Sequence, residues 1–123
     1  MKEIIIVDDD RINNHVCITM IKKIIENVSV TSFTNPNEAL EYLINHKNNF
    51  EGLVIIDVNM PEMSGWQLID LMDQNKIEQQ IIMLTSSISY QDKESAEGIK
   101  MIKDFFVKPM TFELVMKLKE YIT

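Results

Sequence analysis

The stretch Ile4-Ile5-Ile6-Val7-Asp8-Asp9-Asp10 is a short apolar run that ends abruptly in acidic residues. A continuous run of Ile and Val is typical of a strand that is covered on both faces, as in a parallel sheet. Similar apolar runs recur at residues 28–33, 53–56, 81–84 and 105–107. The run at 28–33 alternates apolar and polar residues, which indicates a strand nearer the edge of the sheet. The chain is therefore predicted to contain five strands.

Helical patterns separate these runs. Asn35 followed by Pro36 is typical of a helix N-cap and a first helical residue, and predicts a helix that runs to about residue 44. A period of four predicts an earlier helix with the apolar stripe Ile12, Val16, Met20 and Ile24. Further helices are predicted at residues 66–72, 91–101 and 111–122. Five strands that alternate with five helices indicate an α/β fold, a parallel sheet with helices on both faces.

The composition indicates one globular domain over residues 1–123, since 46% of the residues are hydrophobic and 25% are charged. A net charge of −7 argues against direct binding of nucleic acid or of anionic membranes. No apolar run approaches the roughly 20 residues that span a bilayer. The single cysteine, Cys17, excludes an internal disulfide, and with only His15 and His46 beside it a zinc site is not expected. The expected location is the cytoplasm.

Reactive side chains follow the carboxyl ends of four predicted strands. The aspartates at 8–10 follow the first, Asp57 follows the third, Thr85 ends the fourth and Lys108 follows the fifth. In an open parallel sheet these ends meet at the edge where ligands bind. Each position alone has an ordinary explanation, such as a helix cap for Asp10. Four complementary groups in this order favour a functional site.

Carboxylates that converge at this edge need a compensating charge. Two ionised carboxylates about 4 Å apart repel by roughly 4 kcal/mol at an effective dielectric of 20. Asp8, Asp9 and Asp57 would therefore hold a proton or a cation, and oxygen ligands favour Mg²⁺. Lys108 adds a positive charge and Thr85 adds a hydroxyl donor. Together they predict a phosphoryl-transfer site with Asp57 as the nucleophile.

The segment Ile55-Ile56-Asp57-Val58-Asn59-Met60-Pro61-Glu62-Met63-Ser64-Gly65 fits the pattern D-x-x-M-P-x-M-x-G. It resembles the phosphoacceptor segment of the receiver domains of two-component response regulators. The acidic pair in Val7-Asp8-Asp9, the hydroxyl residue in Leu84-Thr85-Ser86 and the run Phe105-Phe106-Val107-Lys108-Pro109 resemble the same family. The resemblance covers essentially the whole chain. It implies the flavodoxin-like, doubly wound fold with strand order 2-1-3-4-5.

The resemblance also implies residue roles. Asp57 would accept a phosphoryl group from a sensor histidine kinase or a histidine phosphotransfer protein in a phosphorelay. Asp9 and Asp57 would bind Mg²⁺ through their side chains, Asn59 through its backbone carbonyl, and Asp8 mainly through water. No enzyme activity is implied beyond phosphoryl transfer and dephosphorylation at Asp57 itself.

A conformational switch is implied by the same resemblance. Thr85 would move toward the phosphoryl group, which Lys108 also contacts, and Phe105 would swing inward from the surface. Many family members have Tyr where this chain has Phe105, so a hydroxyl that could anchor either state is missing. The side chains two positions beyond Asp57 and Thr85, Asn59 and Ser87, would tune the lifetime of the phosphorylated state.

The implied output face comprises the helix at 91–101, the strand at 105–107 and the helix at 111–122, through which several family members dimerise when phosphorylated. The first helix is where family kinases usually dock, and Asn13, Asn14 and His15 lie there. Charged and apolar candidates on the output face are Lys100, Met101, Lys103, Asp104 and Lys119. A downstream protein target would bind at this face.

Two other functions remain open at this point. A pseudo-receiver would keep the fold and bind partners without being phosphorylated, although Asp57, the acidic pair and Lys108 are all present. A haloacid-dehalogenase-like phosphatase would use the pair Asp8 and Asp10 as its catalytic aspartates. That alternative leaves the segment from Asp57 to Gly65 without a role.

Overall fold

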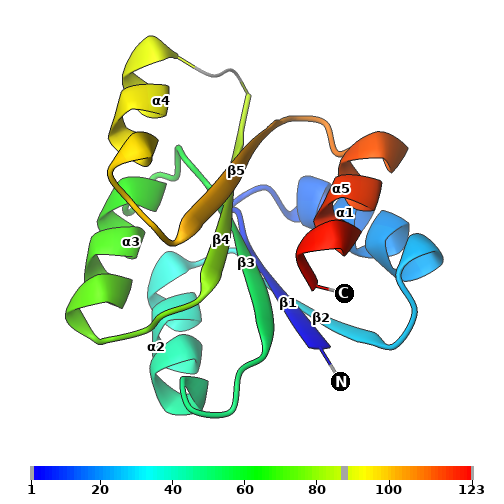
Figure 1. Cartoon of the computed structure of the whole chain (residues 1–123), viewed down its shortest axis with the longest axis horizontal. Coiled ribbons are helices and arrows are strands. Elements are labelled where there is room, and N and C mark those ends of the chain that lie inside the picture. The colour runs from blue at the N-terminus through cyan, green and yellow to red at the C-terminus, as the bar shows by residue number, and fades with distance from the viewer. Residues whose placement is uncertain (1, 87–88, 123) are drawn as a thin grey trace.

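Five parallel strands form one sheet with helices on both of its faces (Figure 1). The computed structural model describes residues 2–86 and 89–122. The strands are β1 (Lys2–Val7), β2 (Val28–Phe33), β3 (Gly52–Asp57), β4 (Gln80–Thr85) and β5 (Ile102–Val107). Their order is β2-β1-β3-β4-β5. The predicted doubly wound fold is confirmed, and the alternating strand β2 does lie at an edge.

The helices are divided between the two faces of the sheet. They are α1 (Arg11–Ile24), α2 (Pro36–His46), α3 (Gly65–Gln74), α4 (Tyr90–Glu97) and α5 (Phe112–Ile122). Helices α1 and α5 lie side by side on one face, whereas α2 and α3 cover the other (Figure 1). Asn35 caps α2 by accepting a hydrogen bond from the backbone N–H of Asn37 at 2.8 Å, and Pro36 begins the helix, as predicted.

Each central strand contributes to two hydrophobic cores because its side chains alternate between the faces. In β3, Leu53 and Ile55 pack into the core under α1 and α5. Val54 and Ile56 pack into the core under α2 and α3. A strand buried on both faces requires an unbroken apolar sequence, which explains the continuous runs. None of the helices that the structure describes is long and apolar enough to cross a bilayer.

The apolar stripe predicted for α1 is partly wrong. Ile12 is 78% exposed and Val16 is 41% exposed. The buried residues of α1 are Asn14, Cys17 and Ile21. The reason is geometric: an α-helix has 3.6 residues per turn, so a strict period of four drifts by about 40° at each step. Residues at one end of such a series therefore leave the buried face. Cys17 is a free thiol and is buried in the core under α1 and α5.

Helix α4 is shorter than predicted. It ends at Glu97 instead of extending to Met101, and β5 begins at Ile102 rather than Phe105. The register between β4 and β5 shifts because Ile81 pairs with Ile102 while Ile82 pairs with Asp104, which leaves a bulge there. None of the α4 side chains that the structure describes is buried. The described side chains of α4 therefore form no buried face against the sheet.

Gly52 at the start of β3 has a φ of +153°, and a Cβ atom there would overlap the backbone carbonyl of Glu3 on β1. We expect Gly52→Ala to lower the free energy of unfolding by about 2–3 kcal/mol, because the overlap is with backbone that cannot rotate away. Urea denaturation measures this.

Gly98 provides the matched control. A Cβ atom at Gly98 would have no neighbour within 4 Å, and its φ is −86°. Gly98→Ala should change the stability by less than about 1 kcal/mol. Equal effects of the two substitutions would contradict the steric explanation for Gly52.

Candidate functional site

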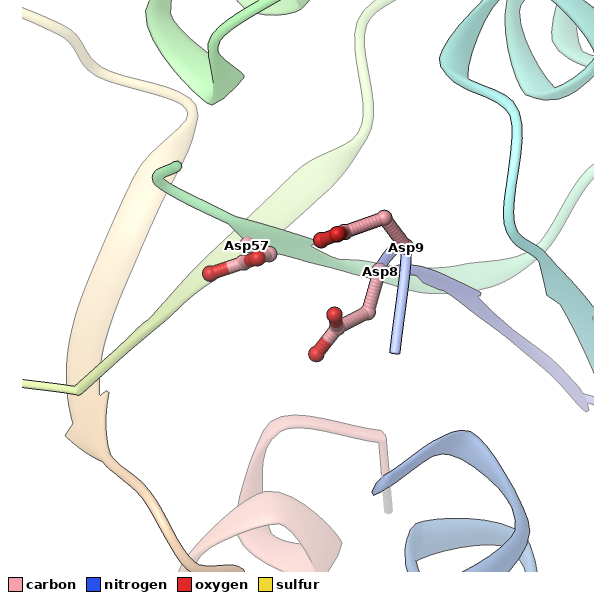
Figure 2. A group of neighbouring side chains, drawn as sticks. All are labelled: Asp8, Asp9 and Asp57. Carbon is pink, nitrogen blue, oxygen red and sulfur yellow. The ribbon is translucent and has the colours of Figure 1, made fainter. Parts of the chain in front are cut away.

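Three carboxylates gather at the carboxyl ends of β1 and β3. The side chains of Asp8 and Asp9 leave the end of β1 beside Asp57, the last residue of β3 (Figure 2). One carboxylate oxygen from each lies within 4.8 Å of those of the other two. Asp8 and Asp57 are buried, whereas Asp9 is exposed. The structure thus brings together the acidic residues that the sequence placed at two separate strand ends.

Strand alternation explains why Lys108 joins them. The side chains of Ile6, Ile55 and Phe106 face the core under α1 and α5. Two residues further along each strand come Asp8, Asp57 and Lys108, which lie toward the same side. Lys108 Nζ lies 2.8 Å from Asp8 Oδ2 and 3.6 Å from Asp57 Oδ1. The ammonium group therefore bridges two buried carboxylates.

Asp8 is held by donors on both of its oxygens. Oδ1 accepts a hydrogen bond from the backbone N–H of Asp10 at 2.9 Å. Oδ2 accepts one from the Asn13 side-chain amide at 2.8 Å, in addition to its contact with Lys108. The Asn14 amide donates to the backbone carbonyl of Asp8 at 2.9 Å. Both oxygens of Asp8 are therefore engaged by groups of the chain, which leaves this carboxylate less free to bind a metal ion directly.

The turn between β1 and α1 has a structural as well as a chemical role. Asp10 is the N-cap of α1, and its side chain accepts hydrogen bonds from the backbone N–H groups of Ile12 and Asn13. The ordinary explanation for Asp10 is therefore correct. Sequence reasoning treated Asn13 and Asn14 as surface groups for a partner and missed their contacts with Asp8. The sequence signal that could have revealed these contacts is the position of the two amides, in the first turn of a helix that directly follows the acidic strand end.

The pKa of Asp57 is strongly perturbed. Burial is the largest cause and the negative charge of Asp8 is the second, and together they raise the pKa of Asp57 to about 7. Lys108 and a hydrogen bond from the backbone of Asn59 act in the opposite direction, and the charge of Asp9 adds to the increase. One ammonium is thus too little positive charge for this cluster near neutral pH.

The same charges favour the ionised form of Lys108. Burial acts to lower its pKa, but the hydrogen bonds and charges of Asp8 and Asp57 outweigh burial, so the pKa of Lys108 lies above its ordinary value. The side chain therefore stays an ammonium. Its backbone N–H donates to the carbonyl oxygen of Thr85 at 2.7 Å, which ties the end of β5 to the end of β4. The peptide bond between Lys108 and Pro109 is cis.

The donor set fits a hard divalent cation. Carboxylate oxygens within one coordination sphere of each other are the ligands that Mg²⁺ prefers, and no thiolate lies among them. A cation at Asp9 and Asp57 would supply the positive charge that Lys108 alone does not. Of the other residues named from the sequence, Thr85 is buried and Asn59 is exposed. Ser87 lies outside the described residues.

Gly65 lets α3 start directly against the segment that follows Asp57. Its backbone N–H donates to the carbonyl of Val58 at 2.8 Å. A Cβ atom on Gly65 would lie 2.6 Å from the backbone oxygen of Asp57, which is too close for any other residue. Ser64 and Gln67 form a capping box at this helix start. The loop after Asp57 is therefore tightly fixed by short-range contacts.

On the opposite side of β5, Phe105 is half-buried and its ring centroid lies 6.1 Å from that of Trp66.

Asp104 is engaged within the chain rather than free for another subunit: the Tyr121 hydroxyl donates to Asp104 Oδ2 at 3.0 Å. His15 on α1 is exposed.

The arrangement of acidic, hydroxyl and ammonium groups at this edge has known counterparts. The model of the response regulator receiver domain family matches residues 4–119. The chain belongs to this family. Receiver domains are signalling domains of two-component systems that bind Mg²⁺ at an acidic pocket and are generally not enzymes. The haloacid-dehalogenase alternative is therefore not supported.

Individual relatives agree with this assignment. The transcriptional regulatory protein FlgR of Helicobacter pylori (strain ATCC 700392 / 26695) is 32% identical over 116 residues, which make up 94% of this chain and 28% of FlgR. A two component response regulator from Cytophaga hutchinsonii has a TM-score of 0.86 at 28% identity, covering 99% of this chain and 96% of that one. Response regulator protein TrrA from Thermotoga maritima, solved in complex with Mg(2+)-BeF, has a TM-score of 0.79 at 28% identity, covering 98% and 99%. This chain spans less than a third of the length of FlgR.

The raised pKa of Asp57 gives a pH-dependent prediction. Between about pH 4 and pH 7 the folded chain keeps a proton on Asp57 that the unfolded chain has lost, so this group destabilises the fold increasingly as the pH rises through that window. Asp57→Asn removes the effect. In EDTA, we expect the variant to be more stable than the wild type by about 1–3 kcal/mol at pH 8, with the difference shrinking toward pH 4.

Urea denaturation of both proteins across the pH range measures the difference, in which other titrating groups cancel. Addition of Mg²⁺ at pH 8 should stabilise the wild type more than Asp57→Asn. A stability difference that is independent of pH would contradict the assigned pKa.

Proposed function

We propose that the chain is a phosphorylation-dependent switch of a two-component phosphorelay, and that residues 1–123 form a single receiver domain. Asp57 accepts a phosphoryl group from a sensor histidine kinase or a histidine phosphotransfer protein. The observation that carries the proposal is the position of Asp57: a buried carboxylate within 4.8 Å of two others and 3.6 Å from the ammonium of Lys108. An Asp57 oxygen forms a bond to phosphorus while the bond from phosphorus to the donor imidazole breaks, and the imidazole takes up a proton.

In this proposal Asp9 and Asp57 bind Mg²⁺ through side-chain oxygens and Asn59 through its backbone carbonyl. Asp8 acts mainly through water, because its own oxygens already accept from Asp10, Asn13 and Lys108. When bound, Mg²⁺ would neutralise the carboxylates and stabilise negative charge on the phosphoryl oxygens.

Phosphorylation would then redistribute the contacts of two residues. Lys108 would exchange part of its interaction with Asp8 for a phosphoryl oxygen, and the Thr85 hydroxyl would hydrogen-bond another. Movement of Thr85 and Phe105 would alter the α4-β5-α5 face. This change is a two-state equilibrium that the modification biases. This face would contact an effector or a second copy of the chain. Asn59 and Ser87 would set how fast the acyl phosphate hydrolyses.

The direct test is intact mass after incubation with acetyl phosphate. We expect a gain of one phosphoryl group that requires Mg²⁺ and that Asp57→Asn lacks, because the amide is not a nucleophile. No gain under conditions that label another receiver domain would reject phosphorylation and support the pseudo-receiver alternative.

A matched pair of variants tests the metal ligands in the same assay. Asp9→Asn and Asp10→Asn each remove one negative charge from adjacent positions, and Asn keeps the capping function of Asp10. Only Asp9→Asn should raise the Mg²⁺ concentration needed for half-maximal labelling, by roughly tenfold or more. An equal shift in both variants would indicate a general effect of charge instead of a ligand role for Asp9.

The phosphodonor protein needs a surface beside Asp57, and we propose an apolar patch formed by the first two turns of α1 and α5. It comprises Ile12 and Val16 on α1 with Phe112 and Met116 on α5, and Phe112 is 62% exposed. The two helices lie side by side and both begin at the edge of the sheet that carries the acidic cluster (Figure 1). Exposed apolar groups arranged around a reactive site are typical of a protein interface.

Ile12→Ala combined with Phe112→Ala tests this patch. We expect transfer from a phosphorylated histidine phosphotransfer protein that labels the wild type to slow by roughly tenfold or more, since two apolar anchors are lost. Labelling by acetyl phosphate should be unchanged. Ile44→Ala on α2, an exposed apolar residue outside the patch, is the control and should transfer normally. Slower labelling by both donors would place the defect in the site and not in docking.

A further inference from the structure

Trp66 is the only tryptophan of the chain, and it packs against the residue proposed to move in the switch. The ring centroids of Trp66 and Phe105 lie 6.1 Å apart with an interplanar angle of 48°. Both side chains are half-buried and pack on the core under α2 and α3. A tilted aromatic pair at this distance contributes to stability beyond the apolar area that it buries. The pair joins the first turn of α3 to β5.

One partner of this pair is fixed to the phosphoacceptor segment. Trp66 follows Gly65, whose backbone N–H donates to the carbonyl oxygen of Val58 at 2.8 Å. Gly65 also lies so close to the backbone of Asp57 that no residue with a Cβ atom would fit there. The capping box of Ser64 and Gln67 fixes the same turn. The position of the indole is therefore tied to the segment that carries the phosphoryl group.

The other partner is tied to Thr85 through the sheet. Phe105 pairs with Met83 in the register of β4 and β5, and Thr85 follows two residues after Met83, so it lies on the same face. The Met83 methyl group is 3.1 Å from the position of a Cβ atom on Gly65, which places this flexible side chain against the start of α3. Phe105 thus lies next to both Trp66 and the strand that ends in Thr85.

We propose that Trp66 is a positioning residue of the switch. Its indole holds Phe105 against α3 in the unphosphorylated state, and on phosphorylation the ring of Phe105 moves away from the indole. This inference rests on the proposed function. Phe105 has no hydroxyl with which to anchor either position. The ring of Trp66 takes over that role by contact, so the energy of the pair sets part of the balance between the two states. Trp66 is also an intrinsic optical probe of that balance.

Fluorescence of Trp66 tests the release. After labelling with acetyl phosphate and Mg²⁺, the emission change is normalised to the phosphorylated fraction, which intact mass gives. We expect a clear change in the wild type and the loss of most of it in Phe105→Leu, because no aromatic ring is then present to leave the indole. An undiminished change in Phe105→Leu would overturn the proposal, since Trp66 would then sense the phosphoryl group through its own loop.

The affinity for beryllofluoride with Mg²⁺ tests the positioning role, read by fluorine NMR so that no tryptophan is needed. TrrA from Thermotoga maritima was solved with the same mimic. Removal of the indole in Trp66→Leu should tighten binding by about 2- to 10-fold, the range expected for loss of one aromatic pair in the unphosphorylated state. Trp66→Phe retains a ring and should return the affinity toward the wild-type value.

A purely structural role makes a different prediction. If Trp66 only anchors α3, both variants lower the stability to urea and neither tightens beryllofluoride binding, which would overturn the proposal. Failure of the proposed function is distinguishable, because the wild type would then gain no mass from acetyl phosphate. A normal gain in mass with unchanged fluorescence would reject the role of Trp66 alone and leave phosphorylation at Asp57 intact.

Discussion

The structure depends above all on an unbalanced set of charges at one edge of its sheet. Three carboxylates lie within one coordination sphere and one ammonium, that of Lys108, lies beside them. Because Asp8 and Asp57 are buried, water screens their repulsion poorly. Asp8 is compensated by Asn13, Lys108 and a backbone N–H, so the remaining cost falls on Asp57, whose pKa rises to about 7. The fold thus presents a carboxylate that a proton or a divalent cation would stabilise.

The sheet makes this cluster possible at little cost elsewhere. Parallel strands end at one edge, and side-chain alternation carries Asp8, Asp57 and Lys108 to the same side as the apolar residues two positions earlier. The apolar runs before them are buried on both faces and set the strand registers, in which Val7 pairs with Ile56. Two hydrophobic cores therefore hold the destabilising group in position. A site on flexible loops could not keep a buried, partly protonated carboxylate so close to its neighbours.

Much of this could be predicted from the sequence because the relevant signals are local. Continuous apolar runs predict the strands, Asn35 and Pro36 predict the start of α2, and the acidic strand ends predict the cluster. The missed features depend on three-dimensional contacts. The side chains of Asn13 and Asn14 reach back to Asp8, and the ring of Trp66 meets Phe105 across two elements. The α1 stripe failed because a period of four is longer than the helical turn.

Helix α4 is packed less tightly than the other helices, and this bears on how a signal would leave Asp57. Helices α1 and α5 bury apolar residues against each other and against the sheet, among them Cys17, Ile21 and Leu118. On the other face, no described side chain of α4 is buried. A structural change follows the route with the fewest buried contacts to break. Thr85 and Phe105 lie on the α4 side by alternation along β4 and β5, so the α4 part of the proposed output face would yield while the proposed docking patch on α1 and α5 stays rigid. The docking patch and the α4 part of the output face thus lie on opposite faces of the sheet.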